Sequence, residues 1–316
     1  MHGTQTETVA IVLDGPGQLS LRTLALQSVT PDDVVVGIEY SGISTGTERL
    51  LWSGRMPPFP GMGYPLVPGY ESVGRVIDAG ERARGRIGER VFVPGATCYK
   101  DARGLFGGAA RRVIVPGARA ISIPDALDER GVLIALAATA YHAIVGGSPP
   151  DLIVGHGVLG RLLARLTLAL GHPAPTVWET NADRHGGAAG YAVVHPDQDA
   201  RKDYRAIYDV SGDGKILDSL IARLGKGGEV VLAGFYENAL SFNFPPAFMR
   251  EARLRVAAEW KPDDLAATKA VIEQGRLSLD GLITHRKPVH EAADAYVTAF
   301  QDPACLKMVV DWRALA

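Results

Sequence analysis

The sequence predicts an α/β protein that combines a doubly wound parallel sheet with a second, β-rich domain. Three observations indicate this fold class. Short strands separated by glycine and proline turns fill residues 1–124, strands alternate with helices over residues 125–261, and a glycine-rich turn joins a strand to a helix at residues 155–160. We therefore expect residues 125–261 to form one domain, and residues 1–124 with residues 262–316 to form the other.

The β-rich domain is predicted from short apolar runs that end in turn residues. We expect its strands at residues 8–13, 19–24, 34–40, 70–79, 89–93, 110–115 and 119–123. Between the third and fourth strands, residues 51–68 are rich in proline and glycine, which is typical of a loop. Large apolar side chains in this loop make it a candidate wall of a binding site: Trp52, Met56, Phe59, Met62 and Tyr64.

The second domain begins at Pro124, where the spacing of apolar residues changes from that of a strand to that of a helix. Residues 128–147 have a helical pattern that is apolar on most sides, which indicates a buried helix. Strand patterns at 192–194, 206–210, 229–233 and 253–257, with a helical pattern at 213–224, predict the rest of the parallel sheet. The last segment has helical patterns at 263–274 and 291–301 and a strand pattern at 306–311, and we expect it to return to the first domain.

Residues 151–180 have the order strand, glycine turn, helix, strand. The turn GHGVLG at 155–160 follows the apolar run 152–154 and precedes a helical pattern. In this context a G-x-G-x-x-G turn binds a dinucleotide, because its glycines allow the tight turn, the approach of the pyrophosphate and close helix–strand packing. Glu179 ends the next strand, where a carboxylate binds the adenosine ribose and repels a 2′-phosphate, so the predicted cofactor is NAD. Arg184 follows nearby and could weaken that preference.

Composition and charge exclude several classes of function. The net charge of −2 gives no reason to expect nucleic acid or an anionic membrane as a partner. The two cysteines, Cys98 and Cys305, are far apart and fit a reducing cytoplasm. No apolar segment reaches the ~20 residues that span a bilayer, and no signal peptide is evident. We therefore expect a cytoplasmic protein without an integral membrane segment, whose partner is a small molecule.

The chain has a β-rich domain, then a nucleotide-binding unit, then a C-terminal segment that is expected to return to the first domain. This order resembles the medium-chain dehydrogenase/reductase superfamily. The markers are residues 69–74 (GYESVG), 88–91 (GERV), 155–160 and 283–285 (ITH), and the resemblance covers nearly the whole chain. It implies a Rossmann domain and a GroES-like catalytic domain. It also places Lys307 where such relatives have a base that pairs with phosphate.

The sequence departs from the zinc alcohol dehydrogenases that it resembles. Those enzymes have cysteine where this chain has Ser44, histidine where it has Tyr70, and cysteine or glutamate near Ala135. Zinc prefers thiolate, imidazole or carboxylate ligands, and only Glu71 remains here. The four cysteines of a structural zinc lobe are represented by Cys98 alone. We therefore expect no metal.

Residues 41–49, 52–54, 57–60, 64–71 and 104–110 resemble, more narrowly, the bacteriochlorophyllide a dehydrogenases. The resemblance implies NAD-dependent oxidation of the 3-(1-hydroxyethyl) group of a bacteriochlorin to 3-acetyl, in bacteriochlorophyll biosynthesis. It also implies a homodimer, since family members commonly pair their nucleotide sheets. Two alternatives stay open: a zinc-free quinone or enoyl reductase that uses NADPH, and a non-catalytic binder of tetrapyrrole or nucleotide.

The predicted site has three parts. Without zinc, a side chain or water must accept the hydroxyl proton, and the candidates are Ser44, Tyr70, Glu71, Thr139 and His142. The predicted cofactor contacts are Gly155, His156, Gly157, Val158, Leu159, Gly160, Glu179, Thr180, Ser211, Gly212, Ala233, Gly234, Phe235 and Lys307.

The third part is the substrate site. A flat macrocycle needs a wide apolar slot, so Phe106 and the aromatic residues of 235–249 are expected to line a second wall, opposite residues 52–64. Plain packing is the alternative for each aromatic residue, for Tyr70 and for His142. Arg49, Arg55 and Arg103 are candidates for the propionate.

Overall fold

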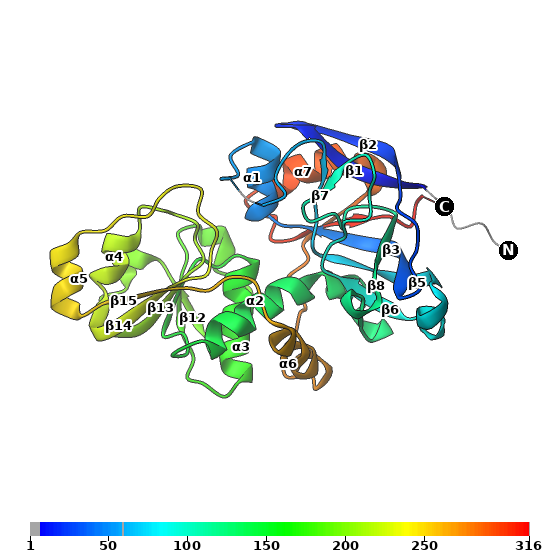
Figure 1. Cartoon of the computed structure of the whole chain (residues 1–316). Coiled ribbons are helices and arrows are strands. Elements are labelled where there is room, and N and C mark those ends of the chain that lie inside the picture. The colour runs from blue at the N-terminus through cyan, green and yellow to red at the C-terminus, as the bar shows by residue number, and fades with distance from the viewer. Residues whose placement is uncertain (1–6, 59, 316) are drawn as a thin grey trace. The chain divides into compact units, whose positions relative to one another are not determined.

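The computed structural model describes residues 7–58 and 60–315, which divide into two compact units (Figure 1). One unit joins the described residues up to Ala135 to those from Leu282 onward, and the other spans Leu136–Gly281. The sequence suggested that the second domain ends at residue 261, whereas helix α6 (Pro262–Glu273) belongs to the second unit. The physical reason is a contact within that unit: the Asp264 carboxylate on α6 bonds to the ring of His142 at 2.7 Å.

The first unit is built from two sheets. One has the strand order β2-β1-β4-β7, made of Gln18–Ala25, Glu7–Gly15, Leu66–Val67 and Arg103–Gly104. The other has the order β16-β17-β3-β5-β6-β9, made of His285–Pro288, Met308–Asp311, Asp33–Ile43, Ser72–Ala79, Arg90–Val93 and Ile121–Ser122, and β8 (Arg112–Pro116) also pairs with β3. Strand β17 pairs antiparallel with β3, so the end of the chain completes the sheet of the first unit.

The second unit contains a parallel sheet of order β12-β11-β10-β13-β14-β15. Its strands are Ala192–Val194, Thr176–Trp178, Leu152–Val154, Tyr204–Asp209, Leu224–Leu232 and Arg253–Val256. In chain order this is 3-2-1-4-5-6, the order of a doubly wound dinucleotide-binding sheet. The helices are α2 (Ile134–Val145), α3 (Val158–Ala169), α4 (Leu217–Ile221), α5 (Phe244–Arg250) and α6, with α4 and α5 at the end of the sheet that carries β14 and β15 (Figure 1). The predicted α/β class is confirmed.

Several elements differ from the sequence prediction. In place of the single helix expected at 128–147 there is a 3-10 segment, η3 (Asp125–Leu133), followed by α2, and Asp128 within η3 has a non-helical φ of 45°. Two short helices, α1 (Thr47–Ser53) and α5, were not predicted, and α1 extends into the loop expected at residues 51–68. In α5 the two prolines stand in the first turn, where a helix tolerates them.

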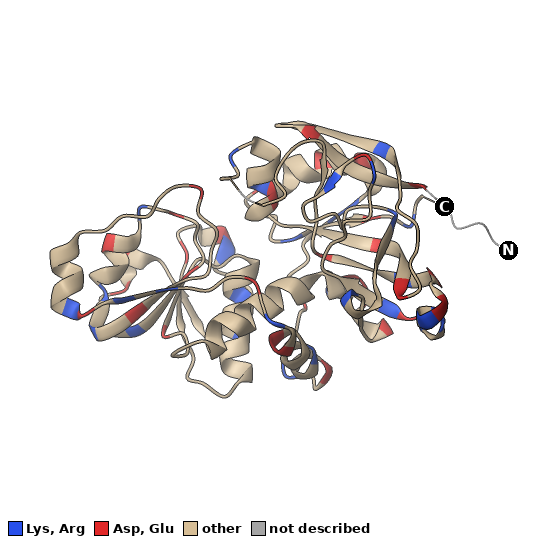
Figure 2. Cartoon of the chain, in the orientation of Figure 1, with Lys and Arg blue, Asp and Glu red and all other residues tan. Residues whose placement is uncertain are grey.

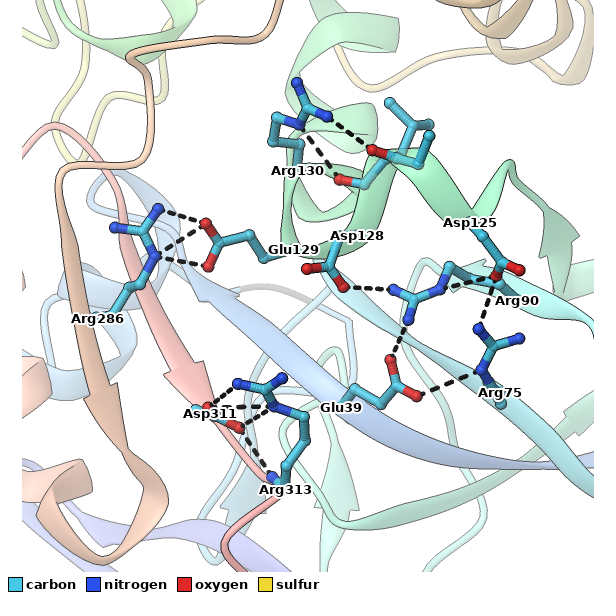
Figure 3. Close-up of polar contacts among 12 residues, drawn as sticks. Glu39, Arg75, Arg90, Asp125, Asp128, Glu129, Arg130, Arg286, Asp311 and Arg313 are labelled. Carbon is cyan, nitrogen blue, oxygen red and sulfur yellow. Dashed lines mark hydrogen bonds and ion pairs between the residues drawn. The ribbon is translucent and has the colours of Figure 1, made fainter.

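Ion pairs hold η3 to the sheet of the first unit (Figure 3). The guanidinium of Arg90 on β6 is 8% exposed and lies 2.6 Å from Glu39 and 2.9 Å from Asp128. Arg286 on β16 pairs with Glu129 of η3. Within the first unit, η3 and β16, which lie near the two points where the chain leaves and re-enters that unit, are therefore joined by an ion pair.

Charged residues of both signs are interspersed in each unit (Figure 2). No helix within the described residues is long and apolar enough to cross a membrane.

Candidate active site

The glycine-rich turn has the geometry of an anion site at a helix N-terminus. Gly155 follows β10 with a φ of +105°, a conformation that glycine adopts without strain. A Cβ on Gly160 would lie 1.8 Å from the carbonyl oxygen of Gly155, so only glycine lets α3 pack this close. Gly157 is the N-cap of α3 and supplies no side-chain cap, and a Cβ there would meet no atom within 4 Å. The open space and the uncapped N–H groups of Val158 and Leu159 fit a pyrophosphate.

Glu179 lies at the end of β11, next to this turn. Its side chain is 9% exposed, and its two oxygens accept hydrogen bonds from the backbone N–H groups of His156 at 3.0 Å and Asn181 at 2.9 Å. Each carboxylate oxygen has a second lone pair, so Glu179 retains the capacity to accept from ribose hydroxyls. Thr180 follows it in an exposed position.

The other expected cofactor residues follow the carboxyl ends of β13 and β14, at the same edge of the parallel sheet. Ser211 and Gly212 come directly after β13, and residues 233–235 come after β14. The prediction did not single out Asp209, the last residue of β13, which is 0% exposed. Its carboxylate accepts from the backbone N–H of Ser211 at 2.9 Å and from the Tyr236 hydroxyl at 2.7 Å, so it fixes both turns. Burial raises the pKa of Asp209.

The backbone and the side chain of His156, a predicted cofactor contact, have different surroundings. Its side chain is 0% exposed and is turned away from the open side of the glycine turn, towards residues 184–191. Only its backbone N–H, bonded to Glu179, belongs to the ribose side of the site.

Ser44 and Tyr70 come together in the first unit. The Ser44 hydroxyl, just after β3, lies 2.5 Å from the Tyr70 hydroxyl, and Tyr70 packs edge-on against Phe106 with ring centroids 5.2 Å apart. Thr47, which the sequence prediction missed, also hydrogen-bonds to Tyr70. Burial, followed by the negative charge of Glu71, raises the pKa of the Tyr70 phenol well above its usual value. Tyr70 is therefore suited to donate a hydrogen bond to a substrate oxygen and poorly suited to act as a base.

Glu71 is buried and forms an ion pair with Lys307. The Lys307 ammonium lies 2.6 Å from Glu71 Oε2 and 3.2 Å from the carbonyl oxygen of Ile43, and both side chains are almost fully buried. This position of Lys307 does not fit the expected contact with a pyrophosphate, because the ammonium is used inside the first unit. Within the described residues, Glu71 Oε1 has no hydrogen-bond partner. Burial raises the pKa of Glu71, and the charge of Lys307 opposes that shift.

Glu48 is a second buried carboxylate that the sequence prediction missed. It is 0% exposed on α1, and its oxygens accept from the Tyr296 hydroxyl at 2.7 Å and the Ser44 backbone N–H at 3.2 Å. Burial raises the pKa of Glu48 to about 7. One signal was present in the sequence: Glu48 lies three residues before Leu51, on the apolar face of what proves to be a helix.

The side chains at the positions of zinc ligands in related enzymes do not fit zinc. Ser44 and Tyr70 are hydroxyls bonded to each other, and the carboxylate of Glu71 is held by an ammonium group. Among residues 7–58 and 60–315, no group of three or more His, Cys, Asp or Glu side chains is arranged to hold a metal. No step of the chemistry below is assigned to a metal.

Thr139 and His142 lie one turn apart on α2, in the second unit, and both are partly exposed. His142 Nδ1 is 2.7 Å from Asp264 Oδ2. Because a carboxylate only accepts, Nδ1 carries the proton and Nε2 of the neutral ring is left as an acceptor. The pair thus has the arrangement of a base and the carboxylate that orients it.

The large apolar side chains of residues 52–64 that the structure describes lie in one cluster with Phe106, which was expected in the opposite wall. Trp52, Met56, Met62, Tyr64 and Phe106 are partly buried and pack against Leu13, Leu51, Leu66 and Leu105. Phe59 lies outside the described residues. The arginines suggested for a propionate are exposed, and Arg103 donates to the carbonyl oxygen of Met62 at 2.6 Å.

The second wall, expected from the aromatic residues of 235–249, does not form as one surface. Phe235 follows the carboxyl end of β14 and is 40% exposed. Phe244, Phe248 and Met249 instead lie on α5 and border a cavity of about 420 Å³ that Lys226, near the amino end of β14, also lines. These α5 residues therefore lie towards the opposite edge of the sheet from the cofactor turns.

Comparison with known proteins agrees with this architecture. Residues 30–125 match the alcohol dehydrogenase GroES-like domain. An alcohol dehydrogenase of Escherichia coli CFT073 solved with NADH has 20% identity and a TM-score of 0.83, covering 97% of this chain and 100% of that one. A dehydrogenase of Sinorhizobium meliloti 1021 solved with NADP has 23% identity and a TM-score of 0.81, covering 98% and 100%.

Two relatives are much more similar in sequence. The 2-desacetyl-2-hydroxyethyl bacteriochlorophyllide A dehydrogenase of Cereibacter sphaeroides is 59% identical over 98% of this chain and 99% of its own length. The protein of the same name from Rhodobacter capsulatus is 58% identical over 97% and 99%. Such identity over the full length, together with the nicotinamide-nucleotide dehydrogenase fold, shows the family. The chain belongs to the 2-desacetyl-2-hydroxyethyl bacteriochlorophyllide A dehydrogenases of the medium-chain dehydrogenase/reductase superfamily.

Proposed function

We propose that this enzyme oxidises the 3-(1-hydroxyethyl) group of a bacteriochlorophyllide a precursor to 3-acetyl, with NAD⁺ as the hydride acceptor. The carbinol carbon loses a hydride to NAD⁺ and the hydroxyl loses a proton, so the products are the acetyl pigment, NADH and H⁺. The observation that carries the proposal is the full-length identity of 59% and 58% to two relatives named for this substrate.

The choice of NAD over NADP rests on Glu179. Its buried carboxylate stands at the end of β11, beside the glycine turn, where it would repel a 2′-phosphate. When bound, the nicotinamide ring supplies the hydride acceptor. The chain's own contribution is to hold the pyrophosphate at the N-terminus of α3 and the ribose at Glu179.

The proposed catalytic candidates of the first unit are Ser44, Tyr70 and Glu71, and those of the second unit, taken separately, are Thr139 and His142. The Ser44–Tyr70 hydroxyl pair binds the substrate hydroxyl, because a phenol with a raised pKa stays protonated and donates. The proton acceptor is His142, whose Nε2 is left open by the bond from Nδ1 to Asp264, or Glu71, whose Oε1 has no partner within the described residues. The cluster of residues 52–64 with Phe106 contacts the macrocycle.

The functional test uses purified protein, NAD⁺ and 3-(1-hydroxyethyl) bacteriochlorophyllide a. Oxidation to the acetyl pigment extends the conjugation of the ring, so the long-wavelength absorption band shifts to longer wavelength as NADH appears. Absence of both signals, with a folded protein, would rule out the proposed reaction. NADPH-driven reduction of a quinone or enone instead would identify the enzyme as a reductase.

We further propose that the enzyme is a homodimer joined at strand β15. This strand is at the edge of the parallel sheet, and no described strand pairs with its outer side. Leu254 is 40% exposed and Val256 is 75% exposed, and an open apolar edge is the surface that a second copy pairs with. Multi-angle light scattering should show a dimer that Val256→Lys converts to monomer, and a monomeric wild type would exclude this interface.

A further inference from the structure

The segment between β11 and β12 has little structure of its own. Residues 180–191 have the sequence TNADRHGGAAGY, and their regular structure is limited to the 3-10 turn Ala182–Arg184. Gly187 and Gly190 adopt positive φ values of 79° and 81°. Glycine and alanine bury little apolar surface and glycine loses much entropy when it is ordered, so contacts from outside must fix this segment.

The buried imidazole of His156 supplies two of those contacts. Its Nδ1 lies 2.6 Å from the carbonyl oxygen of Arg184, and its Nε2 lies 2.9 Å from the hydroxyl of Tyr191. The rings of His156 and Tyr191 also meet edge to face, with centroids 5.6 Å apart. One side chain from the glycine-rich turn therefore contacts the segment near its middle and at its end.

The protonation of His156 follows from its partners. A carbonyl oxygen only accepts, so Nδ1 carries a proton and donates to Arg184. Burial lowers the pKa of His156 to about 4, so the ring is neutral at the pH of the cytoplasm or of an assay. Nε2 then accepts from the Tyr191 hydroxyl. Both ring nitrogens are thus satisfied in one tautomer.

Arg161 reinforces the same connection. Its side chain is 4% exposed in the first turn of α3, and it donates to the carbonyl oxygens of His156 at 3.0 Å and Arg184 at 2.9 Å. A Cβ on Gly187 would lie 2.4 Å from this guanidinium, so the segment passes directly over it. The carbonyl of Arg184 uses both lone pairs, one for each basic side chain.

We propose that His156 is a positioning residue that holds residues 180–191, through Arg184 and Tyr191, in the conformation that receives the adenosine half of the dinucleotide. The inference rests on the proposed binding of a dinucleotide at the glycine turn. Two facts connect the segment to that half of the ligand. The segment begins directly after Glu179, and the backbone N–H of His156 donates to the Glu179 carboxylate at 3.0 Å. His156 thus orders the carboxylate with its backbone and the adjoining segment with its ring.

The test measures binding of ADP-ribose, which carries the adenosine half without nicotinamide, by calorimetry, and kcat at saturating NAD⁺. His156→Leu removes both ring hydrogen bonds and should raise the Kd for ADP-ribose about tenfold or more, while kcat changes less than about twofold. Tyr191→Phe removes one bond and should raise the Kd about fivefold. His156→Asn keeps a donor near the position of Nδ1 and should match Tyr191→Phe. His172→Leu, beyond the far end of α3, is the matched control and should bind like wild type.

The results for the variants test the positioning role, and the result for the wild type tests the dinucleotide site. An unchanged Kd in His156→Leu and Tyr191→Phe overturns the positioning role, and so does a fall in kcat as large as the rise in Kd. If His156→Leu does not fold, His156→Asn and Tyr191→Phe decide the question alone. Failure of the wild type to bind ADP-ribose at all would overturn the dinucleotide site itself, and the positioning role with it.

Discussion

Replacing Glu48 by Gln should stabilise the protein at neutral and alkaline pH. Glu48 is 0% exposed, and its oxygens accept from the Tyr296 hydroxyl and the Ser44 backbone N–H. A glutamine can accept from Ser44 with its carbonyl oxygen and donate to the Tyr296 oxygen with its amide. The variant therefore keeps both contacts and removes only the buried charge.

The magnitude follows from the shift in pKa. Burial raises the pKa of Glu48 from its ordinary 4.5 to about 7 in the folded protein. Between these values the folded state binds more protons than the unfolded state, so the stability contributed by the protonated group is fully present below the unfolded pKa. It is lost as the pH rises through the folded pKa. A shift of this size corresponds to about 3 kcal/mol of unfolding free energy.

The assay is urea unfolding of wild type and Glu48→Gln at pH 5 and pH 8. We expect similar free energies of unfolding at pH 5 and a variant more stable by about 2–3 kcal/mol at pH 8, because other titrating groups cancel in the difference. Glu81→Gln, at an exposed position on the first unit, is the matched control and should show no such pH-dependent difference. A difference that is the same at both pH values, or a variant less stable at pH 8, would refute the reasoning.

Further substitutions test the cofactor site, the proton route and the buried ion pair. Glu179→Ala removes the carboxylate that would repel a 2′-phosphate, so the ratio of kcat/KM for NAD⁺ to that for NADP⁺ should fall at least about tenfold; an unchanged ratio would count against the ribose assignment. Tyr70→Phe and His142→Ala should each lower kcat by about 100-fold if they bind the hydroxyl and accept its proton, and near-normal kcat in both across pH 6–9 would exclude this route. Lys307→Met leaves the Glu71 carboxylate buried and unpaired, and should lower the unfolding free energy by about 3–5 kcal/mol. Urea unfolding checks this, with the double variant Glu71→Gln/Lys307→Met expected to recover part of the loss.

The geometry of the glycine turn was predictable because its signals are local. The glycines at 155, 157 and 160 are required by backbone geometry within one turn, and Glu179 is one strand further along the chain. Parallel strands bring their carboxyl ends to one edge of the sheet, so the strand pattern by itself places the turns after β13 and β14 beside the glycine turn.

The sequence alone determined the α/β class, the parallel sheet and the glycine turn. The reason is that the hydrophobic period of strands and helices, the turn residues and the spacing of the glycines can all be recognised within short stretches of chain. Only the tertiary structure decided the partners of the buried polar groups. Lys307 meets Glu71 across 236 positions, and Glu48 meets Tyr296 across 248. A buried charge is stable only beside a partner, and that partner is chosen by the folding of distant strands and helices. For the same reason only the tertiary structure shows that the ring of His156 is bonded to Arg184 and Tyr191.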